Sequence, residues 1–252
     1  MKIYAHRGSS GTHPENTLLA FKQVKNLPIF GIEFDVHLTK DGELVVIHDE
    51  KINRTSNGKG YIKDLTLSEL KTYDFGSWFS YKFKGERIPT LSEVLEIFST
   101  TRHHINIELK TDIINYEGIV NKVIELVHSL DFQSRIVISS FNHDTIREVK
   151  QLAPHIETAV LSMKELINPF DYVHAIPADA LHISVKTALL PSTGKVIRQG
   201  LPVRVFTVNK IKYIGRLKQA NVIAIFTDYP EKMYKYLNHN KITQKIIQLF
   251  EM

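Results

Sequence analysis

Short apolar runs alternate with helix-like segments along nearly the whole chain. Residues 3–6 and 31–36 form the first two strand-like runs, and a segment with helical spacing over about 17–25 separates them. A further helix is expected over roughly 116–130. The remaining strand-like runs lie at 106–110, 135–141, 157–162, 180–185, 202–208 and 222–228. Strands that alternate with helices pair in parallel, so this pattern predicts an α/β fold.

The stretch EFDVHLTKDGELVVIHD, residues 33–49, breaks this alternation. It has two strand-like halves around Asp41-Gly42, and an Asp-Gly pair in that setting predicts a hairpin. A turn centred on this pair would place Asp35 opposite His48. The second half is then an antiparallel excursion rather than a member of the parallel sheet. Without it eight parallel strands remain, and eight strands in about 250 residues predict a TIM (β/α)8 barrel.

Residues from about 50 to 90 do not fit the alternation of strands and helices. They are rich in glycine, lysine and aromatic residues, and we expect them to form a small insertion after the second strand. The helix that should follow this strand then spans 90–100, with Ser92 as its N-cap. One or two closing helices are expected after Pro230, including the segment KITQKIIQLFEM. The chain, 1–252, is thus expected to be a single barrel domain.

Composition and charge narrow the classes of partner. Hydrophobic residues are 43% of the 252 residues and charged residues 23%, an ordinary globular balance. The formal charge of +5 mildly favours anionic ligands. Lysine and arginine are dispersed and form no dense basic block, so we expect no nucleic-acid partner. Cysteine is absent, which excludes disulfides and thiolate metal sites.

The N-terminal sequence bears on the expected location. Lys2 leads directly into IYAHRG, which leaves no room for a secretory leader before this first motif. No apolar run reaches the ~18 residues of a membrane span. We therefore expect a cytoplasmic protein without stable membrane insertion, although leaderless export stays open. The sequence does not predict an oligomeric state.

Acidic residues gather at the predicted carboxyl ends of two strands. Side chains two positions apart on a strand point the same way, so Glu33 and Asp35 share a face, as do Glu108 and Lys110. These strand ends form the active-site face of a TIM barrel. Three carboxylates suit Mg2+ or Ca2+, and the sequence does not choose between them. The simpler interpretation pairs each carboxylate with a lysine or arginine. On a buried face the metal is favoured, because an unpaired interior carboxylate costs several kcal/mol.

Two of the twelve histidines stand out by position. His6 ends the first strand beside Arg7, and His48 is expected opposite Asp35 at the same rim. Two histidines at one site can act as general acid and general base near neutral pH. Six others are expected to be structural or exposed: His37, His103, His104, His143, His174 and His239.

The turn after the first strand offers groups that suit a phosphate. The planar guanidinium of Arg7 has a fork of donors. The loop GSSG at 8–11 and the helix start at Glu15-Asn16-Thr17 can add backbone N–H donors. The alternative is a plain turn, with Asn16 serving as an N-cap.

The motifs that contain these residues resemble one family. HRGSSGTHPENT, IEFDVHLTKDGELVVIHD, NIELK, SSF, VFTVN and FTDYP occur in this order between residue 4 and about residue 230. Together they resemble the glycerophosphodiester phosphodiesterase family. HRG alone would be a weak match, whereas six ordered motifs over nearly the whole chain make a specific one.

The resemblance implies a metal-dependent hydrolysis of glycerophosphodiesters to sn-glycerol 3-phosphate and an alcohol, in a TIM barrel. It implies these roles: His6 and His48 as acid and base; Glu33, Asp35 and Glu108 as ligands of one divalent metal ion, Ca2+ or Mg2+; Arg7 and Lys110 on the phosphate; Glu15 on the glycerol side; and Phe206 as an aromatic wall. The family commonly has tryptophan at the position of Phe206. Phenylalanine keeps the wall but lacks the indole N–H, so the fine substrate preference stays open.

Several alternatives stay open within this interpretation. The nucleophile is either water or the glycerol 2-hydroxyl, which would give a cyclic phosphate, and neither histidine is assigned as the acid. A reaction that stops at the cyclic phosphate would make the protein a lyase. The segment FGSWFSYKF, residues 75–83, offers a wall for the acyl chain of a lysophospholipid, although packing on the barrel rim is favoured. A barrel that binds glycerophosphodiesters without turnover is the remaining, non-enzymatic interpretation.

Overall fold

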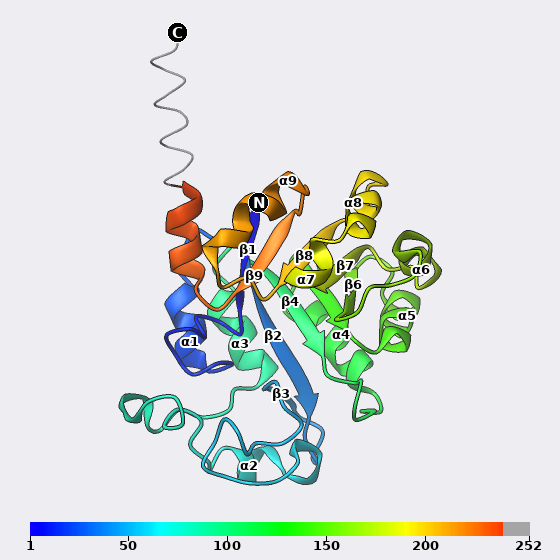
Figure 1. Ribbon diagram of the computed structural model, residues 1–252. Coiled ribbons are helices and arrows are strands. Elements are labelled where there is room, and N and C mark those ends of the chain that lie inside the picture. The colour runs from blue at the N-terminus through cyan, green and yellow to red at the C-terminus, as the bar shows by residue number, and fades with distance from the viewer. Residues whose placement is uncertain (239–252) are drawn as a thin grey trace.

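Eight parallel strands close into a barrel in the computed structural model, which describes residues 1–238 (Figure 1). The barrel strands are β1 (Lys2–His6), β2 (Gly31–Leu38), β4 (His104–Leu109), β5 (Ile136–Ser140), β6 (Glu157–Ser162), β7 (Ala180–Ser184), β8 (Val203–Phe206) and β9 (Ala224–Thr227). The sheet is closed because β1 pairs in parallel with both β2 and β9. The predicted TIM (β/α)8 barrel is therefore confirmed.

Helices surround the barrel and connect its strands. The α-helices are α1 (Leu18–Val24), α2 (Leu67–Leu70), α3 (Leu91–Phe98), α4 (Ile119–Ser129), α5 (His143–Leu152), α6 (Pro169–Ala175), α7 (Val185–Ala188), α8 (Pro191–Arg198) and α9 (Ile214–Gln219). Short 3-10 helices are η1 (Ile62–Asp64), η2 (Tyr81–Phe83), η3 (Gln133–Arg135) and η4 (Ile211–Tyr213). A further helix runs from residue 230 to residue 238. The segment KITQKIIQLFEM lies outside the described residues. No helix within residues 1–238 is long and apolar enough to cross a membrane.

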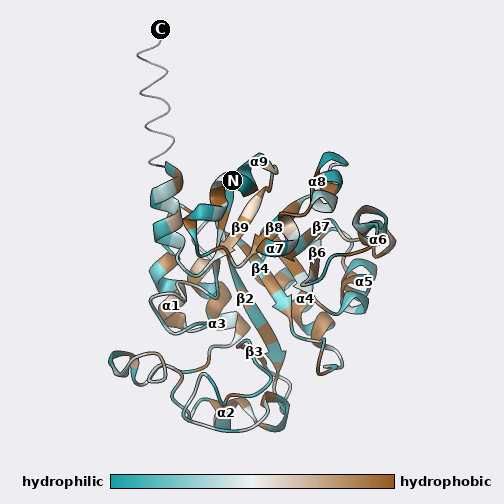
Figure 2. Cartoon of the chain, viewed as in Figure 1, coloured by the Kyte–Doolittle hydropathy of each residue, from teal (hydrophilic) through white to brown (hydrophobic). Residues whose placement is uncertain are grey.

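Strand β2 shows how the sequence sorts side chains between the core and the barrel interior. Its hydropathy alternates from residue to residue (Figure 2). The apolar set packs outward on the helices: Phe34 meets Phe21 of α1 at a ring-centroid distance of 5.6 Å, and Phe21 meets Phe98 of α3. The alternate positions, Glu33 and Asp35, therefore face the barrel interior. This alternation places two acidic side chains inside a fold whose outer layer is an apolar core.

The predicted hairpin exists, but its register is one residue from the predicted one. Strand β3 (Leu44–Val46) pairs antiparallel with β2 and joins no other strand of the described sheet. The expectation that this half is not a barrel strand is confirmed. The backbone carbonyl of Asp35 accepts a hydrogen bond from the Ile47 N–H at 3.0 Å. Asp35 thus lies opposite Ile47 and not His48, so the predicted pairing was wrong.

The reason lies in the length of the turn. Thr39 pairs with Glu43, since the Thr39 N–H donates to the Glu43 carbonyl at 3.0 Å. Three residues therefore form the loop, where the prediction had two. Gly42 closes it with a φ of +80°, a left-handed conformation that glycine adopts without strain. Three-residue loops of this kind are a common hairpin type, and a sequence that contains Asp-Gly fits both lengths.

The insertion after the second strand is confirmed and lies beyond the arrowhead of β2 (Figure 1). It contains η1, α2 and η2. Its own apolar cluster is small: Val45, Ile47, Ile52, Ile62, Leu70, Phe75 and Ile88. Because the cluster includes Val45 and Ile47, the insertion packs directly on the returning strand of the hairpin.

The N-cap of helix α3 lies two residues before the expected one. It is Thr90 rather than Ser92, so that prediction was wrong. The Thr90 hydroxyl accepts from the Glu93 N–H at 3.2 Å, and the Glu93 carboxylate accepts from the Thr90 N–H at 2.7 Å. This reciprocal arrangement is a capping box, which has a glutamate or glutamine three positions after the cap.

The capping box gives a stability prediction with an internal control. Thr90→Ala removes the acceptor for an orphan helix N–H, and we expect it to lower the free energy of unfolding by about 1 kcal/mol. Ser92→Ala is expected to change it by less than about 0.5 kcal/mol, because it removes no cap. Urea denaturation of both variants measures the difference. Equal losses would contradict the assignment of Thr90 as the cap.

Candidate active site

A cavity of about 200 Å³ opens at the carboxyl ends of the barrel strands. Six of the residues expected in the site line it: His6, Arg7, Glu33, His48, Glu108 and Phe206. A larger cavity of about 790 Å³ lies between α6 and α8, and no residue of the expected site lines it. Convergence of titratable groups, rather than size, therefore identifies the site.

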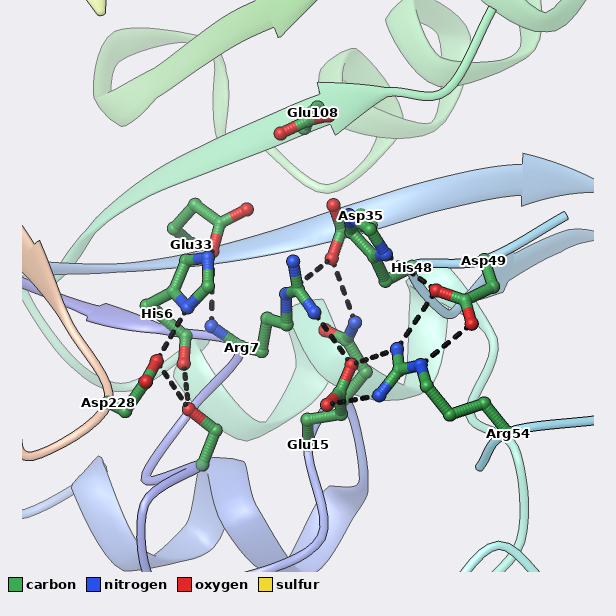
Figure 3. A network of polar contacts seen from close by, with 12 residues as sticks. His6, Arg7, Glu15, Glu33, Asp35, His48, Asp49, Arg54, Glu108 and Asp228 are labelled. Carbon is green, nitrogen blue, oxygen red and sulfur yellow. Dashed lines mark hydrogen bonds and ion pairs between the residues drawn. The ribbon is translucent and has the colours of Figure 1, made fainter. Parts of the chain in front are cut away.

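Three carboxylates converge at this cavity, as the sequence predicted. One oxygen each of Glu33, Asp35 and Glu108 lies within 4.8 Å of the others. The strand register brings them together, because Asp35 of β2 is the direct partner of Glu108 of β4. Figure 3 shows the three residues on these neighbouring strands. The side chains are 5%, 1% and 12% exposed, respectively, so water screens their charges weakly.

The burial of this cluster perturbs its titration. Burial, reinforced by the charges of Asp35 and Glu108, raises the pKa of Glu33 well above its usual range. Burial and the charge of Asp35 also raise the pKa of Glu108. For Asp35, burial is the largest influence and acts in the same direction. The charges of Arg7, His48 and Lys110 and the hydrogen bond from Asn16 together outweigh it and hold the pKa below the usual range. The cluster thus concentrates more negative charge than its surroundings stabilise.

Two cations contact the cluster without neutralising all of it. Lys110 lies 2.9 Å from Glu108, and the Nε of Arg7 lies 3.3 Å from Oδ2 of Asp35. Among the described residues, Glu33 forms no ion pair with a lysine or arginine side chain. The simpler interpretation, in which each carboxylate has its own lysine or arginine, therefore fits Asp35 and Glu108 but not Glu33.

Asn16 contributes to the cluster in a way that the sequence did not indicate. It is not the N-cap of α1; Thr17 is, and its hydroxyl accepts from the Ala20 N–H at 3.2 Å. The Asn16 amide instead donates to Oδ2 of Asp35 at 2.9 Å. The other oxygen of Asp35, Oδ1, is buried and has no hydrogen-bond partner in the described chain. A buried acceptor without a donor is the feature expected of a cation ligand.

His6 is oriented by a carboxylate that directly follows the last barrel strand, β9. Its Nδ1 lies 2.7 Å from Asp228, which also accepts from the Ser10 hydroxyl at 3.0 Å. Burial would raise the pKa of Asp228, but the hydrogen bonds, with that from His6 foremost, lower it. Asp228 is therefore ionised at neutral pH and holds a proton on Nδ1. The other nitrogen, Nε2, lies 3.9 Å from Glu33, on the side of the carboxylate cluster.

His48 has the same kind of support. Its Nδ1 lies 2.7 Å from Asp49. Two nitrogens of Arg54 donate to the two carboxylate oxygens of Asp49, at 2.7 and 2.9 Å. Arg54 also donates to both oxygens of Glu15, at 2.9 and 2.8 Å. Figure 3 shows this chain of contacts continuing from Glu15 to Arg7. The hairpin register thus differs from the predicted one, yet His48 still lines the cavity.

Three residues of this network, named below, were not predicted from the sequence. Asp49 and Asp228 lie inside the motifs VVIHD and FTDYP, so their positions next to His48 and at the end of β9 could have indicated them. Arg54 lies in the insertion, and no local pattern distinguishes it from the other basic residues there.

The remaining expected site residues lie close to the cavity. Phe206, at the end of β8, lines it and meets Phe141 edge to face at 6.1 Å. Lys110 follows β4 directly and lies 5.8 Å from the ring of Phe141. Glu15 is held between the guanidinium groups of Arg7 and Arg54 and does not line the cavity. Its role toward glycerol stays a prediction.

His37 has the structural role expected of it. It is fully buried, its Nδ1 lies 3.0 Å from the Tyr116 hydroxyl, and its Nε2 lies 3.1 Å from the His48 carbonyl. Because that carbonyl can only accept, Nε2 carries the proton. Burial lowers the pKa of His37 to about 4. His37 is therefore a neutral support for the backbone of His48.

This lowered pKa gives a testable dependence of stability on pH. The unfolded chain binds a proton at His37 below pH 6.5, whereas the folded protein binds it only near pH 4. The stabilisation is therefore complete above pH 6.5 and is lost as the pH falls toward 4. The slope of unfolding free energy against pH is proportional to the number of protons that unfolding takes up. In His37→Gln, we expect this number to be smaller by about one in this pH window. Urea denaturation at several pH values measures the slope, and an unchanged slope contradicts the prediction.

Comparison with known proteins agrees with this geometry. Residues 6–232 match the family described as the glycerophosphoryl diester phosphodiesterase family. A glycerophosphodiester phosphodiesterase of Caldanaerobacter subterraneus subsp. tengcongensis is 42% identical, over 92% of this chain and 95% of the relative. One of Bacillus altitudinis is also 42% identical, over 93% of this chain and 97% of the relative.

Solved structures give the same result. A phosphodiesterase of Oleispira antarctica, in complex with the product sn-glycerol-3-phosphate, superposes with a TM-score of 0.87 at 30% identity, covering 94% of this chain and 97% of the other. A glycerophosphodiester phosphodiesterase from Thermotoga maritima gives 0.77 at 27% identity, covering 94% and 98%. The chain therefore belongs to the glycerophosphoryl diester phosphodiesterase family and is a phosphodiesterase enzyme.

Proposed function

We propose that this enzyme hydrolyses glycerophosphodiesters to sn-glycerol 3-phosphate and an alcohol, with one divalent metal ion, Ca2+ or Mg2+, and with His6 and His48 as the acid and base. One observation supports the proposal above all. Two histidines, each with a carboxylate on Nδ1, lie at one cavity with three converging carboxylates.

The carboxylate cluster fits a hard divalent cation. Glu33, Asp35 and Glu108 would hold it. The unpartnered Oδ1 of Asp35 and the lack of a lysine or arginine partner for Glu33 among the described residues favour its binding. When bound, such an ion stabilises negative charge on a phosphate oxygen. Arg7 and Lys110, already at the cluster, are proposed to bind the other phosphate oxygens.

The two histidines divide the proton transfers. Because Asp228 and Asp49 hold the protons on Nδ1, the Nε2 atoms are free to act. One histidine takes the proton of the nucleophile, and the other donates a proton to the departing alcohol. Phosphorus NMR of the reaction with glycerophosphocholine tests this function. Glycerol 3-phosphate is expected as the product; a cyclic phosphate that persists identifies a lyase, and the absence of any product overturns the proposal.

The support of His6 by Asp228 leads to a prediction. Asp228→Asn keeps the shape of the side chain but removes the charge, and its amide can donate to Nδ1 and move the proton to Nε2. We expect kcat to fall at least about 100-fold with little change in KM. Asp144→Asn is the matched control, since Asp144 is exposed on α5. Steady-state kinetics of both variants measure the effect, and equal activities contradict it.

A lysophospholipid is a second candidate substrate. In the aromatic segment of the insertion, Phe75 and Phe83 are buried, as packing on the rim requires. Trp78, Phe79 and Tyr81 are 38%, 36% and 75% exposed. Exposed aromatic side chains are typical of surfaces that contact lipids. Activity on lysophosphatidylcholine vesicles that exceeds activity on glycerophosphocholine would favour this candidate, and the reverse would exclude it.

Three further expectations stay predictions. They are a single domain over 1–252, a cytoplasmic location, and the absence of a nucleic-acid partner.

A further inference from the structure

His182 is a buried histidine that the proposed chemistry does not use. It lies in the middle of β7, is fully buried, and lines the same cavity as His6 and Glu33. Since it precedes the end of its strand by two residues, it lies deeper in the barrel than the catalytic rim. Its ring packs against Phe226 at a centroid distance of 5.0 Å.

The neighbouring strand fixes the tautomer of this imidazole. Arg204 of β8 is the direct strand partner of His182, and its Nη1 lies 3.0 Å from Nε2 of the ring. A guanidinium can only donate, so Nε2 accepts and the ring proton lies on Nδ1. Burial and the charge of Arg204 lower the pKa of His182 well below its usual range. The ring is therefore a neutral donor at neutral pH.

Arg204 is itself held in place from the amino-terminal end of the barrel strands. It is 6% exposed, and it forms an ion pair with Glu157, the first residue of β6. Arginine stays charged at any physiological pH. The guanidinium of Arg204, held by Glu157, therefore keeps the ring proton of His182 on Nδ1 at neutral pH.

The Nδ1–H of His182 has no hydrogen-bond partner among the described residues, although it is buried. The cavity also contains a buried acceptor without a partner, Oδ1 of Asn106, whose amide nitrogen donates to Ser139 at 2.9 Å. Buried polar atoms without partners are rare in proteins. One free donor and one free acceptor in a small cavity suit a ligand that carries hydroxyl groups, because a hydroxyl both donates and accepts.

We propose that His182 is a specificity-determining residue, whose Nδ1–H donates a hydrogen bond to the terminal hydroxyl of the bound glycerol group. The inference rests on the proposed function. Arg7, Lys110 and the metal ion that the three carboxylates would hold are proposed to take the phosphate at the rim. We place the glycerol carbon chain in the same cavity, toward His182. The hydroxyl farthest from the phosphate then reaches the depth of His182. The Glu157–Arg204 pair acts through His182 and positions its donor.

A substrate pair tests the hydrogen bond directly. Glycerophosphocholine is compared with its 1-deoxy analogue, which lacks the terminal hydroxyl but keeps the 2-hydroxyl. For the wild type we expect kcat/KM to be about 10- to 100-fold lower with the analogue, because the site leaves its donor unpaired. In His182→Leu we expect the two substrates to differ by less than about threefold. A wild type that does not distinguish them, or a variant that still does, overturns the inference.

Two further variants distinguish a loss of substrate preference from a general effect of substitution on the structure. His182→Gln can accept from Arg204 and still donate to the ligand, so it is expected to keep most of the preference that His182→Leu loses. His128→Leu makes the same substitution as the loss variant on the outer helix α4, and it is expected to keep the full preference. A loss of preference in His128→Leu would contradict the assignment.

Nitrogen-15 NMR of the wild type tests the tautomer without any variant. We expect the proton of His182 on Nδ1, and a shift of this signal when sn-glycerol 3-phosphate is added. A proton on Nε2, or a signal that the product leaves unchanged, overturns the inference even if His182→Leu does not fold. Failure of the wild type to hydrolyse glycerophosphocholine overturns the proposed function instead, and the NMR titration then decides the inference separately.

Discussion

Glu33→Gln is expected to lower kcat/KM for glycerophosphocholine at least about 1,000-fold while raising the stability of the metal-free protein. The two effects have separate causes. The pKa of Glu33 is raised by burial and by the charges of Asp35 and Glu108, so its ionised form destabilises the fold when no cation is bound. Glutamine has the same shape and removes this charge. It also removes a proposed ligand of the metal.

The pH dependence of the metal-free protein follows with a definite sign. A carboxyl whose folded pKa is raised loses stability as the pH rises from its unfolded pKa through its folded one. The wild type should therefore show this loss above pH 4.5, and Glu33→Gln should show less of it. Addition of Ca2+ or Mg2+ should raise the Tm of the wild type but not of the variant.

Thermal unfolding with and without divalent cation measures these effects alongside kinetics. Glu125→Gln is the matched control, because Glu125 is exposed on α4 and should leave Tm, cation response and activity unchanged. A Glu33→Gln variant that is less stable without metal than the wild type, or that keeps full activity, would contradict the proposed role.

His6→Ala and His48→Ala are each expected to lower kcat by about 100- to 10,000-fold, because each removes one partner of the acid–base pair. The fold should be unaffected by either change, since both side chains lie at the rim of the cavity rather than in the apolar core. His174→Ala, at an exposed position of α6, is the control and should retain native activity. Near-native turnover by either catalytic variant contradicts the assignment.

The same two variants can show which histidine is the acid and which is the base. A glycerophosphodiester with a p-nitrophenyl leaving group needs no proton from the enzyme, because p-nitrophenolate is a stable anion. The variant that lacks the acid should regain most of its activity on this substrate, whereas the variant that lacks the base should not. If neither variant regains activity, neither His6 nor His48 acts as a proton donor to the leaving group.

The periodicity of the chain predicted the barrel well because each strand is visible in the sequence as its own short apolar run. The strand at 157–162 has its predicted bounds in the structure, and Glu33 and Asp35 face inward as alternation requires. The convergence of these two residues with Glu108 followed from fold geometry, since parallel strand ends share one face. Local pattern and barrel architecture together were sufficient for the acidic cluster.

Features that depend on the length of a turn or on partners distant in the sequence could not be predicted. Asp41-Gly42 fits turns of two or three residues, and the choice moved Asp35 from His48 to Ile47. Asp228 meets His6 across 222 positions of sequence, which no local pattern encodes.

The tautomer of His182 could not be predicted from the sequence either. It depends on Arg204 in the next strand and on Glu157 in an earlier one, so only the folded barrel shows it.

The release of glycerol 3-phosphate from glycerophosphocholine tests the central claim most directly. Purified protein is assayed after removal of metal, then with Ca2+ or Mg2+, and again after addition of excess chelator. The proposed site predicts negligible release without metal, recovery with one of the two ions, and loss on chelation. Release at the full rate from metal-free protein would contradict the role of Glu33, Asp35 and Glu108 as ligands of a catalytic metal.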